Sequence, residues 1–292
     1  MTNAVIHASV PMKQFRCPNG LRVWNAPKSR HDTHFLFKEI FERHCYEQHG
    51  ISVNNGDVVL DIGANVGMFA LSLMERFRDL KIVCAEPVPN TYACLERNLS
   101  GSPRRSLHDI TLLDCAIGST NADATIAFFP QMPSNSTLHL QEKRRHWERF
   151  SAEVTSSELS NLHRAFAFLP RRVFALIVKP MLKDAQNIKC KIQTLSDTIR
   201  QQALGSVDLL KIDIEGAEIE ALNGLEEQHW PLIRQLVLEI EPSNKHMLSS
   251  LVAKLGALGF SKVTVQSFAG GTVDIEDSKP CTVYALRTTG QQ

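Results

Sequence analysis

One short stretch combines glycines and a carboxylate in the pattern of a ligand-binding turn. It reads VVLDIGANVGMF over residues 58–69, where Asp61 follows an apolar run and Gly63 and Gly67 lie on either side of Asn65. An apolar run, a glycine turn and a helical pattern predict a strand, a tight turn and a helix. Amides at a helix start attract an anion and an acidic side chain attracts a cation, so the turn suits a ligand that carries both charges.

Three interpretations compete for this turn. A dinucleotide-binding turn requires the spacing G-x-G-x-x-G. Here Asn65 stands at the middle glycine position and Gly67 comes one residue early, which argues against an NAD-dependent oxidoreductase. A turn that binds nothing is the plainest alternative, because two glycines alone are not specific. The residues that end the other predicted strands must therefore decide.

Acidic residues end the next two predicted strands. Glu86 ends the second, 23 residues beyond Gly63, where its carboxylate can accept both hydroxyls of a ribose. Asp114 and Cys115 end the third, in a position to flank an adenine ring. Because the carboxyl ends of parallel strands meet at one edge of a sheet, we expect a nucleoside with an amino-acid tail. That description fits S-adenosylmethionine, with Asp61 and the turn amides holding the methionine part.

These motifs resemble a known family across roughly residues 35 to 290. Four segments are similar to the signatures of FkbM-type methyltransferases, in the same order: DIGANVG (61–67), AEPVPNTYACLERNL (85–99), TLSD (194–197) and DLLKIDIEGAEIEAL (208–222). In addition, FFPQMPSNSTL (128–138) resembles members that serve polyketide and nonribosomal peptide pathways.

The resemblance implies a class I methyltransferase fold, S-adenosylmethionine as methyl donor and, most often, a hydroxyl acceptor. By motif position it implies donor-binding roles for Asp61, Gly63, Asn65, Gly67, Glu86 and Asp114. The chain departs from the family pattern at Glu239-Ile240-Glu241, where a Glu-Ile-His type ending is common. The resemblance therefore assigns no catalytic base.

Three carboxylates are candidates for the base that takes the proton of a hydroxyl acceptor. Asp213, Glu215 and Glu239 lie where strand ends deliver them to the same crevice. Each has a structural alternative: Asp213 and Glu215 can cap the helix that follows, and Glu239 can pair with Lys211 on an adjacent strand. The three together suit a divalent metal ion, but carboxylates at strand ends are common without metals, so we predict no metal site.

A doubly wound α/β sheet is the scaffold that brings these residues together. Strands are predicted at 58–62, 81–86, 110–115, 208–213, 235–240, 261–266 and 281–286, and helices near 66–78, 90–99, 217–227 and 244–258. Continuous apolar strands that alternate with helices indicate a mostly parallel sheet covered on both faces, as in the Rossmann-like class I methyltransferases. The last two strands lack a crossover helix, which predicts an antiparallel edge strand.

Residues 1–50 are predicted to form an N-terminal hairpin and helix ahead of a methyltransferase domain over residues 51–292. The hairpin follows from Pro18-Asn19-Gly20 between two strand-like segments, since Asn and Gly accept positive φ. The helix covers residues 31–46, with Asp32 or Thr33 as the expected N-cap.

A long segment, residues 131–191, interrupts the alternation, and we predict a mostly helical lid there that selects the acceptor. Between residues 141 and 191 it carries eleven Lys or Arg against five Asp or Glu, which suits an acidic carrier protein or a substrate phosphate. Its stretch RRVFALIVKPMLK (171–183) suits peripheral contact with a membrane, although a lid helix packed on the main domain is the preferred interpretation.

Composition excludes several other classes. With 292 residues, 43% of them apolar, the chain can bury a full core, and a net charge of +1 gives no general attraction to nucleic acid. Seven scattered cysteines without C-x-x-C spacing indicate neither zinc nor a disulfide framework, and no apolar run reaches the roughly 20 residues of a membrane span. We predict a cytoplasmic protein.

The sequence therefore predicts an S-adenosylmethionine-dependent methyltransferase for a small molecule, directed to oxygen. An acceptor that is already nucleophilic would allow transfer to carbon or nitrogen without a strong base. A non-catalytic nucleoside-binding module is the alternative from another class, and the intact pair of Asp61 and Glu86 argues against it.

Overall fold

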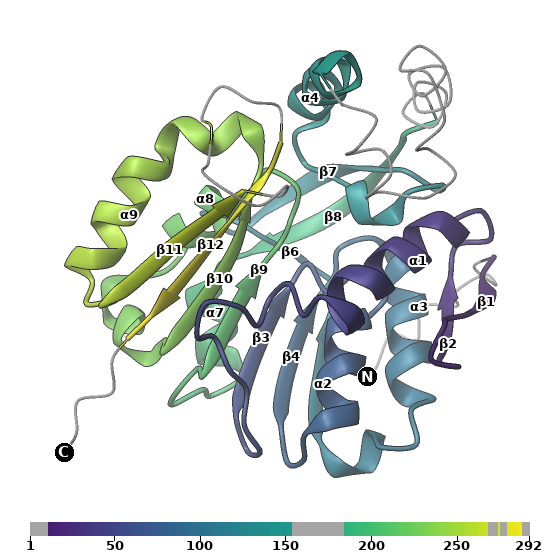
Figure 1. The fold of residues 1–292 in the computed structure, drawn as a ribbon, viewed down its shortest axis with the longest axis horizontal. Helices are drawn as coiled ribbons and strands as arrows, with labels where there is room; N and C mark the ends of the chain where they lie inside the picture. The colour runs from purple at the N-terminus through teal and green to yellow at the C-terminus, as the bar shows by residue number, and fades with distance from the viewer. Residues whose placement is uncertain (1–10, 154–183, 268–273, 275–278, 288–292) are drawn as a thin grey trace.

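A seven-stranded sheet forms the centre of the molecule (Figure 1). The structure is a computed structural model that describes residues 11–153, 184–267, 274 and 279–287. The strand order is β11-β12-β10-β9-β3-β4-β5. The bounds are β3 (Val58–Ile62), β4 (Lys81–Ala85), β5 (Asp109–Leu113), β9 (Leu209–Ile212), β10 (Gln235–Ile240), β11 (Lys262–Ser267) and β12 (Cys281–Leu286).

The sheet confirms the predicted α/β class. Strands β5, β4, β3, β9 and β10 are parallel, and β12 pairs antiparallel with both β10 and β11. The antiparallel pairing lies at the predicted end of the sheet, but the reversed strand β12 is one place in from the edge, because β11 takes the outer position. After β3 the chain adds β4 and β5 on one side of it and later adds β9 and β10 on the other side. The crevice of a doubly wound sheet therefore lies between β3 and β9, where the strand order reverses.

Helices cover both faces of this sheet, as continuous apolar strands require. Val59 of β3 belongs to the hydrophobic cluster under α2 and α3, whereas its neighbour Leu60 belongs to the cluster under α7, α8 and α9. The bounds are α2 (Met68–Arg76), α3 (Pro89–Ser100), α7 (Leu195–Gln201), α8 (Glu218–Asn223) and α9 (Leu248–Ala257). Short helical turns are η2 (Arg105–Leu107), η4 (Glu227–Leu232) and η5 (Pro242–Met247).

The N-terminal part forms the predicted hairpin and a helix. Strands β1 (Lys13–Arg16) and β2 (Arg22–Asn25) pair antiparallel around Gly20, whose φ is +89°. Helix α1 (Arg30–Phe37) continues into the π-helix η1 (Lys38–Glu42). The N-cap is Ser29, so the prediction of Asp32 or Thr33 as N-cap was wrong; both lie inside the first turn, where Thr33 Oγ1 donates to the Ser29 carbonyl.

The described residues of the predicted helical insertion include both helix and strand. The insertion contains η3 (Pro133–Asn135) and α4 (Leu140–Glu153), but residues 186–191 belong to β8 (Gln186–Gln193). Strand β8 forms a second sheet with β6 (Ala116–Ile117) and β7 (Ala122–Phe128). The two-residue alternation of Ile188, Cys190 and Ile192 with polar residues was the signal for this strand. The predicted membrane-contact segment, residues 171–183, lies outside the described residues.

The glycine turn packs directly on the end of β9. Gly63 has a φ of +77°, and a Cβ added there would lie 1.9 Å from the Asp213 carbonyl oxygen. Gly67 has a φ of +84°, and a Cβ there would lie 2.7 Å from Leu95 Cδ1. Gly63 therefore allows close approach of two backbone segments, and Gly67 allows α2 to pack against α3.

Replacing Gly63 with alanine is expected to lower the free energy of unfolding by about 1–3 kcal/mol, because the new methyl group meets backbone and the residue needs a positive φ. Gly205→Ala is the matched control, since a Cβ at Gly205 meets nothing within 4 Å. Urea denaturation of both variants measures the effect. An unchanged midpoint for Gly63→Ala would show that the turn does not pack on β9.

Candidate active site

A cavity of about 690 Å³ opens at the carboxyl ends of β3, β4, β9 and β10. Parts of α1, η1, η3 and α4 line its other walls. Seven of the predicted site residues line it: Gly63, Asn65, Glu86, Cys115, Asp213, Glu215 and Glu239. Asp61, Gly67 and Asp114 are not among the lining residues in the described part of the chain. Most of the predicted site residues therefore line one cavity, and their roles stay predictions.

The backbone of the glycine turn and of the next strand end fixes Glu86 in one wall. Its side chain is buried, with Oε2 accepting from the Asn65 amide at 3.1 Å and Oε1 accepting from the Val88 amide at 2.9 Å. Burial raises the pKa of Glu86 to about 7, although these two hydrogen bonds oppose the shift. Each carboxylate oxygen has a further lone pair, so Glu86 can accept two more hydrogen bonds from a ligand in the cavity.

Asp61 supports the turn from behind the cavity wall. Its buried Oδ1 lies 3.0 Å from Lys211 Nζ, and this nitrogen also donates to the Gly63 carbonyl at 2.7 Å. The Asp61 carboxylate thus holds Lys211, which holds the turn, and a contact between Asp61 and a ligand stays a prediction. Gly67 likewise serves helix packing, and Asp114 is an exposed residue beyond β5.

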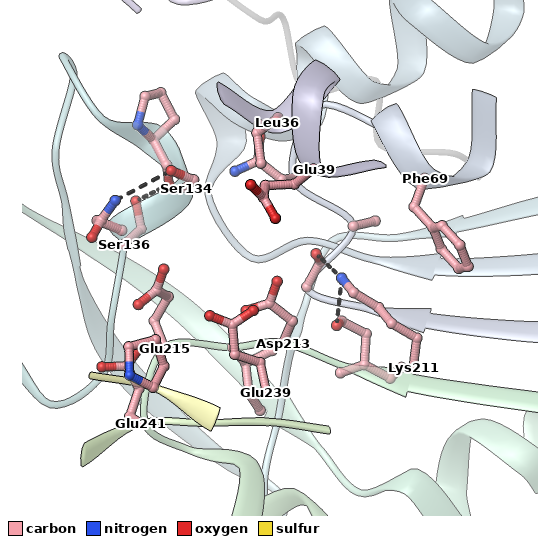
Figure 2. Close-up of a pocket in the computed structure, with 18 of the residues that line it drawn as sticks. Leu36, Glu39, Phe69, Ser134, Ser136, Lys211, Asp213, Glu215, Glu239 and Glu241 are labelled. Atoms are coloured by element: carbon pink, nitrogen blue, oxygen red, sulfur yellow. Dashed lines mark hydrogen bonds between the residues drawn. The ribbon is translucent and has the colours of Figure 1, made fainter. Parts of the chain in front are cut away.

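Four carboxylates gather on the side of the cavity formed by the ends of β9 and β10, with Glu39 of η1 facing them (Figure 2). Asp213 Oδ2 accepts a hydrogen bond from Tyr46 Oη at 2.6 Å. Glu215 pairs with Lys143 of α4, and the same ammonium lies 3.3 Å from Glu241 Oε1.

Glu239 differs from these neighbours because no hydrogen-bond or ion-pair partner holds it within the described part of the chain. Lys211, which the sequence offered as an ion-pair partner for Glu239, pairs with Asp61 instead. Burial raises the pKa of Glu239 well above its usual range, and repulsion from Asp213 and Glu241 adds to the shift. A carboxylate with a raised pKa is suited to general-base chemistry near neutral pH.

Glu218, not Glu215, accepts a backbone hydrogen bond just before the start of α8. It is fully buried, and its Oε1 accepts from the Gly216 amide at 2.8 Å, whereas the Glu215 side chain bonds Lys143. Burial raises the pKa of Glu218 to about 8, and the nearby Glu241 adds to the effect. Glu218 is therefore part of the polar support behind the site.

The stability of Glu218→Gln relative to the natural protein is expected to depend on pH. The folded-state pKa of about 8 lies above the unfolded value, so stability from this carboxyl is full at low pH and is lost as pH rises through about 8. The glutamine variant has no such loss, and its relative stability should grow between about pH 4 and 8 by at most roughly 1.4 kcal/mol per unit. Urea denaturation across this range, with exposed Glu96→Gln as control, measures it. A constant difference between natural protein and variant would contradict the burial argument.

Two groups of lining residues were missed from the sequence. Leu36, Glu39 and Ile40 come from α1 and η1, which were predicted only to pack over the core. From the sequence, Lys143 was only one of the Lys and Arg residues that give the insertion its excess of positive charge. Lys143 and Glu215 are 72 positions apart in the sequence, and a contact over such a separation leaves no local sequence pattern.

The sheet order, the glycine turn and the strand-end carboxylates define a class I methyltransferase that depends on S-adenosylmethionine. A family model described as the methyltransferase FkbM domain matches residues 61–261, and the chain belongs to this family.

Relatives cover most of the chain. Methyltransferase sdnD of Sordaria araneosa is 32% identical over 227 residues, which are 74% of this chain and 78% of that protein. The 31-O-demethyl-FK506 methyltransferase FkbM of Streptomyces tacrolimicus is 30% identical over 281 residues, which are 96% and 98% of the two chains. The solved structure of methyltransferase FkbM from Methylobacillus flagellatus KT is 14% identical with a TM-score of 0.42; the match covers 88% of this chain and 55% of that one.

Other features of the described residues bear on the remaining predictions. All seven cysteines lie within the described residues and are free thiols. Among the described helices, none has the length and apolar character needed to cross a membrane. In the same part of the chain, no cluster of three or more His, Cys, Asp or Glu side chains is arranged for a metal ion.

Proposed function

We propose that this methyltransferase transfers the methyl group of S-adenosylmethionine to a hydroxyl group of a small molecule in secondary metabolism, of the polyketide or nonribosomal peptide type. The observation that best supports this proposal is that Glu86 and Glu239 line the same cavity, with Glu86 in one wall and Glu239 where β9 and β10 end. A donor site and a proton acceptor in one enclosed space are what such a transfer needs. The relative named for 31-O-demethyl-FK506 supports oxygen as the acceptor atom.

The residues of the cavity fit S-adenosylmethionine, which supplies a methyl group activated on a positively charged sulfur. Glu86 offers two free acceptor positions for ribose hydroxyls, and Cys115 lines the wall beyond β5 as an apolar contact for adenine. Gly63 and Asn65 present backbone close to the ligand, while Asp61 and Lys211 hold that backbone in place. The carboxylates of the opposite wall complement a cationic ligand.

We assign the catalytic base to Glu239. The Glu239 carboxylate would receive the O–H proton of the acceptor as its oxygen bonds the methyl carbon; the bound donor would supply that methyl group and keep the electron pair of the broken carbon–sulfur bond on sulfur. Asp213 and Glu215 are less suited, because Tyr46 holds one oxygen of Asp213 and Lys143 holds one oxygen of Glu215. Glu239 is the candidate with free acceptor capacity toward the cavity.

The acceptor specificity is proposed to come from the insertion together with the N-terminal helix. Lys143 of α4 and Ser134 of η3 line the cavity together with Leu36 of α1 and Glu39 of η1. The outer face of α4 exposes Arg144, Arg145 and Arg149, which suits an acidic carrier protein bearing the acceptor. The free thiols support a reducing compartment such as the cytoplasm.

Incubation with S-adenosylmethionine that carries an isotopically labelled methyl group tests the proposal. The partners are a panel of macrolides, peptides and small alcohols, amines and carbon acids, and fragmentation mass spectrometry locates the label. A methyl group on oxygen supports the proposal. A methyl group on carbon or nitrogen replaces it with the alternative acceptor, and no transfer to any acceptor despite donor binding favours the non-catalytic module.

A further inference from the structure

Lys143 is a buried cation that the insertion helix places among the carboxylates of the main domain. Its side chain is only 5% exposed, although its helical neighbours Arg144 and Arg145 are exposed. The ammonium forms ion pairs with Glu215, which follows β9, and with Glu241, which follows β10, at 3.3 Å for the latter. One residue of α4 is therefore bound to two strand ends at once.

Burial of an unpaired lysine is costly, so this position is built around the charge. Burial opposes the charged form, but attraction to Glu215 and Glu241 outweighs it and raises the pKa of Lys143. Two carboxylates share one cation, while Glu239 stands beside them without a partner in the described part of the chain. The distribution of charge over these carboxylates therefore depends on Lys143.

We propose that Lys143 is a positioning residue for methyl transfer: its ammonium group binds Glu215 and Glu241 and leaves Glu239 free to receive the acceptor proton. The inference rests on the proposed function, because it takes Glu239 as the base. It also gives the insertion a role beyond lining the cavity, since helix α4 supplies a positive charge that favours the ionised form of Glu239.

Several other groups face the carboxylate of Glu239 and act on its ionisation. Lys143 favours the ionised form, and Asp213, Glu218 and Glu241 disfavour it. The negative charge of Glu239 also helps to raise the pKa values of three weaker acids nearby: Cys45, Tyr46 and Tyr284. Loss of Lys143 removes the cation that opposes these carboxylates, so Glu239 should then ionise only at higher pH.

Two donor analogues report the charge at Glu239 without knowledge of the acceptor. S-adenosylhomocysteine is neutral at sulfur, whereas sinefungin carries an ammonium group at the position of the methylsulfonium. The ratio of their dissociation constants, measured by calorimetry between about pH 5 and 9, should favour sinefungin increasingly as Glu239 ionises. Lys143→Met should move the midpoint of this change upward by about one pH unit, and Lys143→Arg should restore it.

Two further variants separate charge from damage to the fold. Glu241→Gln removes a negative neighbour and should move the midpoint downward, opposite to Lys143→Met. Arg145→Met removes a cation from the exposed side of α4 and should leave the midpoint in place. A purely structural role for Lys143 would weaken both ligands equally at every pH.

The possible results separate the role of Lys143 from the assignment of Glu239 as the base, on which that role rests. In one outcome, Glu239→Gln abolishes the pH-dependent change, but neither Lys143→Met nor Glu241→Gln moves its midpoint. That result would overturn the role of Lys143 and leave Glu239 as the base. No pH-dependent preference for sinefungin in the natural protein would overturn the assignment of Glu239 itself. If Lys143→Met does not fold, the shift in Glu241→Gln decides: a downward shift supports the inference, and its absence overturns it.

Discussion

Glu239→Gln is expected to lower the rate of methyl transfer by about 10²–10⁴-fold, the usual contribution of a general base. The amide keeps the shape of the side chain but cannot take the acceptor proton. Donor binding should change far less, because Glu86 lies at the end of a different strand, β4. The rate of the natural protein should rise with pH as Glu239 ionises, above the usual range of a glutamate, since burial raises its pKa.

The two other candidate carboxylates supply the comparison for this prediction. Asp213→Asn leaves the Tyr46 hydroxyl with an acceptor oxygen, and Glu215→Gln leaves Glu241 to pair with Lys143, so both should reduce the rate less than Glu239→Gln. Single-turnover rates at several pH values, with the acceptor that the labelling experiment identifies, measure all three variants. Full activity in Glu239→Gln with a large loss in Asp213→Asn would move the base to Asp213.

Glu86→Ala is expected to weaken binding of S-adenosylhomocysteine by about 1.5–3 kcal/mol, or roughly 10- to 150-fold, the range for hydrogen bonds to a charged group. The loss follows because two ribose hydroxyls would face a wall without acceptors. The natural protein should also bind more tightly as pH rises through about 7, since the ionised carboxylate is the better acceptor.

Glu96→Ala is the matched control for this variant, because Glu96 is an exposed residue of α3. Calorimetry gives the dissociation constants, and circular dichroism checks that both variants are folded. Glu86 also holds the Asn65 and Val88 amides, so a small loss of stability is expected alongside. Natural affinity in a folded Glu86→Ala protein would show that this wall does not hold the ribose.

The sequence predicted the strands and the site location because both depend on local patterns. Continuous apolar runs mark strands buried on both faces, and residues that end parallel strands meet at one edge. Glu86 and Glu239 were expected at this edge for that reason, and both line the cavity. The contact between Asp61 and Lys211 was missed because it depends on register: Asp61 lies directly opposite Lys211 on β9, and a one-residue shift would turn it to the other face.

Long-range pairing explains the remaining differences. Strand β8 pairs with β7 across the whole insertion, so a segment read as helical ends in a sheet. Tyr46 reaches Asp213 across 167 residues, and its position within a helical pattern gave no sign of this contact. Such contacts depend on how the elements pack, which no short window of sequence contains.

We propose that the glycine turn and Glu86 form a binding site for S-adenosylmethionine. Calorimetric titration of the natural protein with S-adenosylhomocysteine, and in parallel with NAD, measures binding at this site. We expect saturable binding of one S-adenosylhomocysteine per chain and no heat from NAD. Binding of NAD without binding of S-adenosylhomocysteine would contradict the account.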